Sequence, residues 1–105
     1  MTSTTFTFKN GNKYTYTAYD IDTQFKDAKA NYMFCYQKDG KWNMAYVGQT
    51  TELGTRFADH HKMSCAKNKG ATHVLVRVNN DEQARLAEEK LFIETYKPPC
   101  NEMLK

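Results

Sequence analysis

Arg56 and His60 are a pair of side chains that could act together on a phosphate group. They are four residues apart in a stretch predicted to be helical, which would make them neighbours on one surface. A guanidinium can bind phosphate through two parallel hydrogen bonds, and an imidazole can donate to phosphate or move a proton. An exposed Arg–His pair at this spacing is also common, so the pair alone is weak evidence for a site. His61 would point about 100° away, toward solvent.

The carboxylate of Glu89 is a second candidate group. At about 100° per residue, it falls within the arc formed by Leu86, Phe92, Ile93 and Tyr96. A carboxylate among apolar neighbours is costly unless it meets a cation or good hydrogen-bond donors. The favoured interpretation is structural: Glu89 lies at the rim of this face or pairs with an arginine. The alternative is a Mg²⁺ site, because Mg²⁺ keeps most of its waters and takes one or two protein oxygens.

Tyr32 and Tyr46 lie in two segments predicted to pair as adjacent strands, which places the two phenols close to opposite one another. The chain has seven tyrosines, so core packing is the default explanation of one such pair. Lys62, Lys67 and Lys69 make the end of the Arg56 helix basic. A solvated surface explains these lysines, and a track for nucleic-acid phosphates is the alternative.

The N-terminal segment alternates threonine with aromatic residues around a Gly-containing loop, which predicts a β-hairpin. A three-residue loop around Gly11 would set Phe8 opposite Tyr14 and Phe6 opposite Tyr16. This register gives one aromatic face and one threonine face. We expect the aromatic face to cap the core, with a stacking surface for bases as the alternative.

The remaining segments predict a second hairpin, two helices and one more strand. Asp39-Gly40 is a strong turn signal, Gly48 is expected to interrupt the strand that follows it, and Pro98-Pro99 stops the last helix. A connection fills residues 20–29. The expected strands span 31–37, 42–47 and 73–78, and the expected helices span about 51–66 and about 81–96. We therefore predict an α+β domain with a small, mainly antiparallel sheet flanked by helices.

Length and composition limit the classes of protein that the chain can form. Its 105 residues predict one domain. The net charge of +3 is compatible with nucleic acid but too weak to argue for it alone. The sequence has no apolar run long enough to span a membrane and no signal-peptide pattern. Three cysteines at unpatterned spacing argue against a disulfide framework or a zinc site. We expect a soluble, cytoplasmic protein.

Taken together, these residues resemble the GIY-YIG nuclease domain in order and in spacing. Tyr46-Val47-Gly48 is similar to the second tripeptide of the family, with Val for Ile. Ala30-Asn31-Tyr32 stands where the first tripeptide would, and it keeps only the tyrosine. Arg56 comes ten residues after Tyr46, where the family carries its catalytic arginine, and His60 follows at the family's four-residue interval.

The C-terminal part of the chain continues the resemblance. Glu89 matches the metal-binding glutamate of the family, and Asn101 matches the asparagine that closes the motif. Six positions in the right order are much stronger evidence than any one of them. Two departures are the missing glycine of the first tripeptide and Gly54, which stands where many members carry an additional arginine. The resemblance covers residues 30–101. We therefore divide the compact domain into an N-terminal β-hairpin extension, 1–29, and a nuclease-like part, 30–105.

The resemblance implies a metal-dependent endonuclease that cuts a DNA phosphodiester by attack of water. Tyr32 is the candidate general base, with support from Tyr46, while Arg56 and a Mg²⁺ or Mn²⁺ ion on Glu89 stabilise charge on the phosphate. A phenol has a pKa near 10, so it needs nearby positive charge to act at neutral pH. Asn101 would brace the site by hydrogen bonding.

Partners and rival functions follow from the same resemblance. We expect a DNA substrate, branched or otherwise structured, with RNA as an alternative, and no membrane partner. The protein would act as a monomer, or as a homodimer where both strands are cut. One rival function is a catalytically inactive nucleic-acid-binding module on the same fold. The other is a small interaction protein that docks through its aromatic hairpin.

Overall fold

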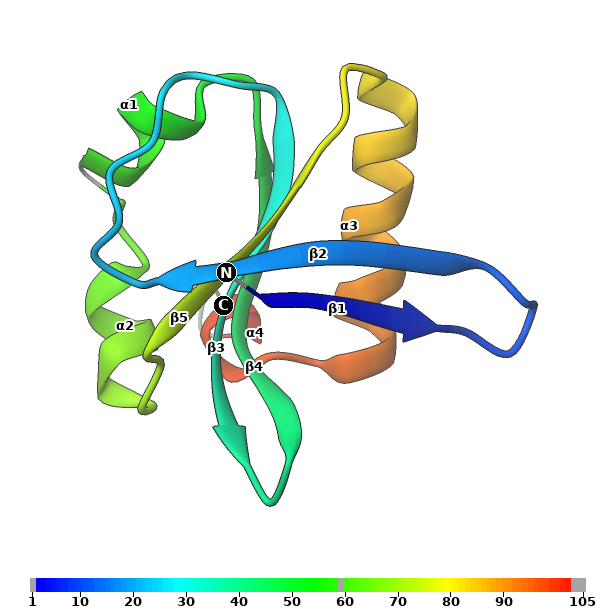
Figure 1. The fold of residues 1–105 in the computed structure, drawn as a ribbon, viewed down its shortest axis with the longest axis horizontal. Coiled ribbons are helices and arrows are strands. Elements are labelled where there is room, and N and C mark those ends of the chain that lie inside the picture. The colour runs from blue at the N-terminus through cyan, green and yellow to red at the C-terminus, as the bar shows by residue number, and fades with distance from the viewer. Residues whose placement is uncertain (1, 59, 103–105) are drawn as a thin grey trace.

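The computed structural model describes residues 2–58 and 60–102, so the predicted domain end at 103–105 lies outside the described residues. These residues form an α+β fold, as predicted (Figure 1). In chain order, the elements are β1 (Thr2–Thr7), β2 (Lys13–Asp20), β3 (Ala30–Lys38), β4 (Lys41–Thr50), α1 (Leu53–Ala58), α2 (Met63–Asn68), β5 (His73–Val78), α3 (Glu82–Tyr96) and α4 (Pro99–Glu102).

The five strands form one sheet in the order β1-β2-β5-β3-β4. Every pairing between neighbouring strands is antiparallel. The N-terminal hairpin belongs to this sheet, because β2 pairs with β5 from Thr17↔Val76 to Asp20↔His73. The segment predicted as an extension is therefore continuous with the strands that carry the candidate tyrosines.

The N-terminal hairpin has the predicted faces but a different register. Phe6 lies opposite Tyr14, two residues away from the predicted pairing with Tyr16. Because the shift is an even number of residues, the aromatic side chains still share one face. Phe8 closes the loop, with its N–H donating to the Asn12 carbonyl at 2.9 Å. The aromatic face packs around Phe92 of α3, which confirms its predicted role in the core.

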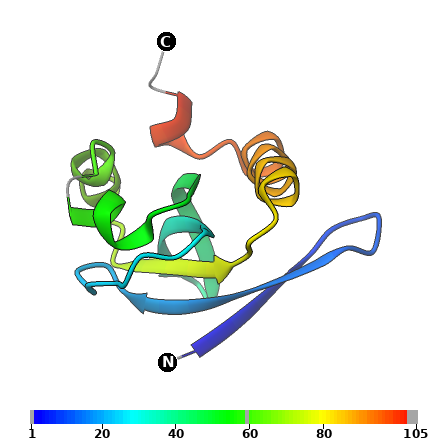
Figure 2. The same ribbon diagram turned by 90° about the horizontal axis from the view of Figure 1, so that it is seen from above.

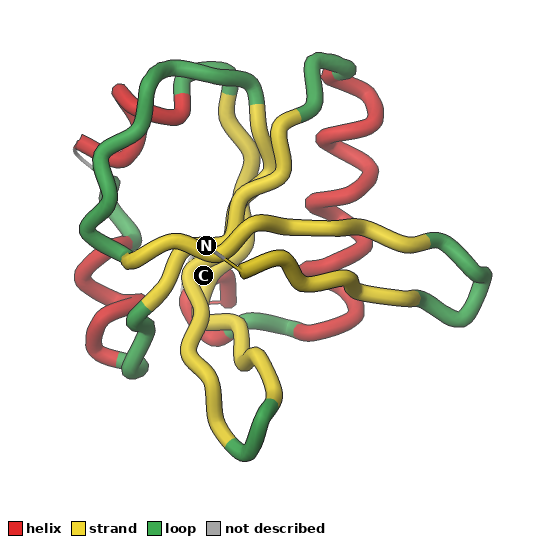
Figure 3. Tube along the Cα trace, in the orientation of Figure 1, coloured by secondary structure: helices red, strands yellow, loops and turns green. Residues whose placement is uncertain are grey.

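Helices cover both faces of the strongly twisted sheet, as Figures 2 and 3 show. One buried cluster joins Phe34 and Val74 of the sheet to Leu53 of α1 and Ala66 of α2. The second cluster, around Met33 and Leu75, lies under Phe92 of α3. Alternation along each strand divides its side chains between these two clusters. None of the helices in the described ranges has the length and apolar character needed to cross a membrane.

The prediction of one continuous helix from about residue 51 to 66 is wrong, because the helical segment begins at Leu53 and is interrupted. The chain forms two short helices, α1 and α2, on either side of residues 59–62, of which residue 59 is not described. Gly48 does not interrupt β4, which continues to Thr50. The last helix agrees with its prediction: the Asp81 side chain caps it by accepting from the Ala84 N–H at 3.1 Å. After Tyr96, the left-handed Lys97 (φ 47°) ends it.

Candidate functional site

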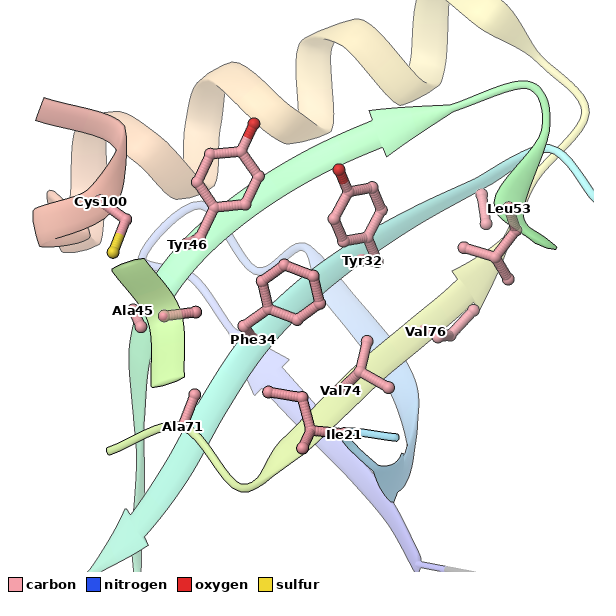
Figure 4. Close-up of a cluster of buried hydrophobic side chains, with 12 residues drawn as sticks. Ile21, Tyr32, Phe34, Ala45, Tyr46, Leu53, Ala71, Val74, Val76 and Cys100 are labelled. Carbon is pink, nitrogen blue, oxygen red and sulfur yellow. The ribbon is translucent and has the colours of Figure 1, made fainter. Parts of the chain in front are cut away.

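A β-bulge brings Tyr32 and Tyr46 to the same face of the sheet. From the turn at Asp39-Gly40, the two strands pair residue by residue up to Cys35 and Met44. The next pair is Phe34 with Tyr46, so β4 has one extra residue between the two pairs. Without that extra residue, Tyr32 and Tyr46 would lie on opposite faces, because side chains alternate along a strand. Figure 4 shows both hydroxyl groups pointing the same way above Phe34, and the ring centroids of the two tyrosines are 6.2 Å apart. The two tyrosines are close, as predicted, but they do not lie directly opposite one another. Tyr32 lies opposite Gly48, and Tyr46 is its diagonal neighbour.

Gly48 provides the space that the Tyr32 hydroxyl occupies. A Cβ atom at residue 48 would lie 2.6 Å from Oη of Tyr32 and 3.0 Å from the Tyr46 ring. Atoms do not approach that closely without displacement, and Tyr32 is buried, with 1% of its surface exposed. The glycine that the motif places here is thus required by the packing of the two phenols.

Substitution of Gly48 by Ala should displace Tyr32 and lower both stability and any activity of the site. We expect a loss of about 1–3 kcal/mol in the free energy of unfolding, as for other overpacked core positions. Gly11→Ala measures the separate cost of backbone strain, because residue 11 has open space around it but a positive φ (88°) that favours glycine, whereas Gly48 is constrained by crowding and not by φ. Denaturant unfolding measures both variants, and equal stability of Gly48→Ala and wild type would contradict the packing described.

His60 reaches Tyr32 from the segment between α1 and α2. Its Nδ1 accepts the Lys62 backbone N–H at 3.0 Å, and its Nε2 lies 2.5 Å from Oη of Tyr32. Burial, reinforced by the positive charge of Arg56, lowers the pKa of His60 to about 3, so the ring is neutral. A neutral imidazole whose Nδ1 accepts must carry its proton on Nε2. His60 therefore donates to the Tyr32 oxygen and is not free to take the Tyr32 proton. Of the roles considered from the sequence, His60 keeps that of a hydrogen-bond donor and loses that of a base for Tyr32.

Arg56 of α1 acts on both tyrosines, and its charge also acts on His60, although the described residues show no hydrogen bond between Arg56 and His60. Because α1 ends at Ala58, the guanidinium Nη2 instead donates to Nδ1 of His61 at 3.1 Å. His61 was expected to face solvent, and it is exposed as well as bonded to Arg56. Burial raises the pKa values of Tyr32 and Tyr46, and the charge and hydrogen bonding of Arg56 partly oppose this rise.

The rise in pKa caused by burial is larger than the fall caused by Arg56, so the pKa values of both tyrosines stay above their ordinary value. The negative charge of Glu89 on α3 adds to the effect of burial and raises both pKa values further. Tyr32 is thus protonated at neutral pH when Arg56 is the neighbouring cation. A second cation beside Glu89 would oppose both the effect of burial and the effect of the Glu89 charge, and would lower the pKa of Tyr32.

Glu89 is half-buried, and burial raises the pKa of its carboxyl group. The side chain makes no hydrogen bond or ion pair with any described residue. Within residues 2–58 and 60–102, no group of three His, Cys, Asp or Glu side chains gathers around a common point. One partly desolvated carboxylate without a protein cation fits Mg²⁺ or Mn²⁺, which keep several waters and need only one or two protein carboxylates.

The buried stripe of α3 differs from the predicted arc. Leu86 and Tyr96 are exposed, while Arg85, Glu88 and Phe92 face the protein. Glu88 pairs with Arg77 at 2.5 Å and accepts from the Tyr16 hydroxyl. Sequence reasoning missed this network, because two adjacent glutamates gave no sign of which one is buried.

Arg85 forms a second buried contact between α3 and the sheet. Its Nη1 donates to the Asn79 carbonyl at 2.9 Å and its Nε to Gln49 at 3.2 Å. Asn31, next to Tyr32, donates its amide to the Arg85 carbonyl at 2.9 Å. These bonds set the position of α3 against β3 and β4, and thereby the position of Glu89.

Asn101 of α4 pairs with the exposed edge of β4 beside Tyr46. Its Oδ1 accepts the Val47 N–H and its Nδ2 donates to the Val47 carbonyl, both at 2.9 Å. Val47 thus bonds as if another strand lay beside it, which is the bracing geometry expected of Asn101. Its influence on activity stays a prediction.

A disulfide joins Cys65 of α2 to Cys100 of α4, with Cα atoms 6.0 Å apart. The expectation against a disulfide is wrong. Of the three cysteines, Cys35 of β3 is free and buried in the cluster with Met33, Leu75 and Phe92, and the other two form the bond. The bond fixes the residue next to Asn101 to the helix that follows His60.

Loss of this disulfide should destabilise the protein by about 3–4 kcal/mol, because the bond closes a loop of 35 residues. We expect dithiothreitol to lower the urea midpoint of the wild type and to leave a Cys65→Ser/Cys100→Ser variant unchanged. If the wild type unfolds at the same urea concentration with and without reductant, the bond contributes nothing to stability.

The three candidate lysines are not equivalent. Lys62 is buried, with 8% of its surface exposed, so it does not form the open basic surface expected of it. Lys67 is exposed and forms an ion pair with Asp22 at 3.0 Å. Lys69 is exposed at the end of α2. Only Lys67 and Lys69 are therefore accessible to a phosphate backbone.

The structure thus gathers Tyr32, Tyr46, Arg56, His60 and Glu89 into one cluster, and Asn101 braces the strand that carries Tyr46. No protein-family model, curated protein or solved structure matches the chain. The chemistry of the cluster is therefore argued from its own geometry.

Proposed function

We propose that this protein is a GIY-YIG-type endonuclease that hydrolyses DNA phosphodiester bonds with the help of a divalent metal. The support comes above all from one observation: the buried Tyr32 hydroxyl contacts His60 beside the Tyr46 ring, where the charges of Arg56 and Glu89 both act on it. Core packing does not require a buried imidazole, a guanidinium and a carboxylate around two phenols. A phosphodiester reaction uses each of these groups.

In the proposed mechanism, Tyr32 is the general base. Its ionised oxygen takes a proton from the attacking water as the new phosphorus–oxygen bond forms. Because only 1% of the Tyr32 surface is exposed, this step requires substrate binding to admit the water to the buried oxygen. His60 donates Nε2–H to that oxygen and favours its ionised form, while Tyr46 packs beside it. The bond from phosphorus to one ester oxygen then breaks, and that oxygen is protonated from solvent.

Arg56 binds the non-bridging phosphate oxygens, where negative charge increases in the transition state. Its contact with His61 orients the guanidinium at the end of α1. Glu89 would hold a Mg²⁺ or Mn²⁺ ion, which when bound would supply Lewis-acid stabilisation of the same charge. Asn101 keeps β4, and with it Tyr46, in place through Val47.

The preferred substrate is branched or otherwise structured DNA, with RNA as the alternative, and one site cuts one strand. Double-strand cleavage requires a homodimer or two successive events on a monomer. A cytoplasmic location is also only a prediction, and the disulfide argues against it, because such bonds are typical of oxidising compartments.

Two other functions compete with this proposal. An inactive nucleic-acid-binding module would not need His60 neutral and bonded to Tyr32. An interaction protein that docks through the hairpin would need a free aromatic face, and that face packs against Phe92. Both observations favour the nuclease.

Incubation of the full chain with labelled duplex, flap, branched and single-stranded DNA, and with RNA, tests the proposal. We expect cleavage of at least one DNA in Mg²⁺ or Mn²⁺ and none in EDTA. Salt-dependent binding without cleavage would indicate the inactive module. Neither binding nor cleavage would favour the interaction protein.

A further inference from the structure

A pocket of about 510 Å³ lies between the β2–β3 connection and the helices α1 and α2. Its lining includes the aromatic rings of Phe25 and Phe57, the methionine Met63 and the polar side chains of Thr23 and Gln24. This volume lies within the range of small-ligand sites. The proposed nuclease mechanism uses none of these residues.

The walls of the pocket are held together by specific contacts. Asp27 accepts the Thr55 N–H at 2.8 Å and the Thr55 hydroxyl at 3.0 Å. The Leu53 N–H donates to the Ala28 carbonyl at 3.1 Å. A Cβ atom at Gly54 would lie 2.2 Å from the Phe25 carbonyl, so glycine lets the connection lie directly on α1. The pocket is therefore formed before any ligand binds.

One aromatic ring separates this pocket from the candidate catalytic tyrosine. The centroid of Phe57 is 4.9 Å from that of Tyr32 and 5.4 Å from that of Phe25. Phe57 thus contributes both to the packing around Tyr32 and to the pocket wall. A ligand in the pocket would therefore lie on the far side of the Phe57 ring from Tyr32.

The chemistry of the lining fits a heteroaromatic base. Phe25 and Phe57 lie at 86° to one another, so one ring can stack on a base while the other contacts the edge of the base, and Met63 offers an adaptable apolar contact. The exposed Gln24 amide makes no hydrogen bond with any described residue and can read the edge of a base. Lys67 at the same pocket is 48% exposed and is paired with the exposed Asp22, so it can turn to an adjacent phosphate.

We propose that this pocket takes up an unstacked base of the DNA strand being cut, next to the scissile phosphate. This inference rests on the proposed nuclease function. Unstacking costs least where a base is mismatched, branched or already single-stranded. The pocket would therefore direct cleavage toward structured DNA without a separate DNA-reading domain.

Ala58→Trp fills the pocket without removing any wall, because Ala58 is exposed and lines the cavity. Ala87→Trp, at an exposed residue of α3, is the matched control. DNA carrying 2-aminopurine at single positions around the cleavage point is bound in EDTA and its fluorescence recorded. We expect an increase at one position with wild type and Ala87→Trp, and none with Ala58→Trp.

Cleavage in Mg²⁺ provides the second readout. Ala58→Trp should lower kcat/KM about tenfold to a hundredfold, the range of one lost base–aromatic stack. An abasic site at the responsive position should remove the difference between the two tryptophan variants. Equal fluorescence and equal cleavage for both variants would overturn the proposal that the pocket binds a base, without contradicting the proposed nuclease function. A fluorescence response without any cleavage would overturn the nuclease and leave the pocket, and no binding or cleavage would overturn both.

Discussion

Tyr32→Phe lowers the rate of DNA cleavage by about 10²–10⁴, the usual contribution of a general base. The variant keeps the ring that packs against Phe57 and Phe34 and removes only the oxygen that His60 contacts. Tyr46→Phe is the matched control, because its phenol lies beside Tyr32 and takes no proton in the mechanism; we expect a loss of about tenfold or less. Single-turnover cleavage measures both, and a fully active Tyr32→Phe variant would rule out Tyr32 as the base.

The pH dependence separates a chemical role of Tyr32 from a packing role. Burial raises the pKa of Tyr32 above its ordinary value, so only a small fraction is ionised at neutral pH. That fraction, and with it the wild-type rate, should rise about tenfold per pH unit until the pKa in the metal-bound complex is reached. The residual rate of Tyr32→Phe should not show this rise. A wild-type rate that falls with pH would contradict the assignment.

Glu89→Gln lowers cleavage on the order of 10³-fold, because it removes the charge that would hold the metal while keeping the size of the side chain. Mg²⁺ should raise the Tm of the wild type and not that of the variant. Glu94→Gln, at an exposed residue of the same helix, is the control for loss of one carboxylate.

The same variant has a readout that needs neither DNA nor metal. Glu89 raises the pKa values of Tyr32 and Tyr46 through its negative charge. In EDTA, an ultraviolet titration of Glu89→Gln should therefore show tyrosine ionisation at lower pH than in wild type. An unchanged titration together with wild-type cleavage would remove Glu89 from the site.

Local sequence signals predicted the elements that depend on local chemistry. The strand 73–78 has the predicted bounds, since its run of β-branched residues leaves no competing interpretation. The Asp39-Gly40 turn has positive φ at both residues, as a tight two-residue hairpin requires. The end of α3 before Pro98-Pro99 follows from the missing N–H and fixed φ of proline.

Features that depend on distant contacts were not predictable in this way. Nothing in the sequence marks the bulge between β3 and β4, yet this one residue brings Tyr32 and Tyr46 to the same face. The interruption between α1 and α2 lets His60 turn inward to Tyr32, and only the burial of its ring explains it. The disulfide needs Cys65 and Cys100 to meet through tertiary packing.

The contacts among the candidate site residues differ from those that the sequence predicted, and the role of these residues as a functional site stays a prediction. The motif spacing indicated Arg56 and His60 as partners, whereas the structure pairs Arg56 with His61 and His60 with Tyr32. The pocket beside Phe57 could not be predicted, because its two walls come from segments that the resemblance treats separately.

Cleavage of a branched DNA by wild type and by the Tyr32→Phe/Glu89→Gln double variant, purified in parallel, tests the nuclease assignment most directly. The account predicts Mg²⁺-dependent cleavage by the wild type, none in EDTA, and none by a double variant that is folded and still binds the DNA. Equal cleavage by the two proteins, or none by the wild type on any DNA, would contradict it.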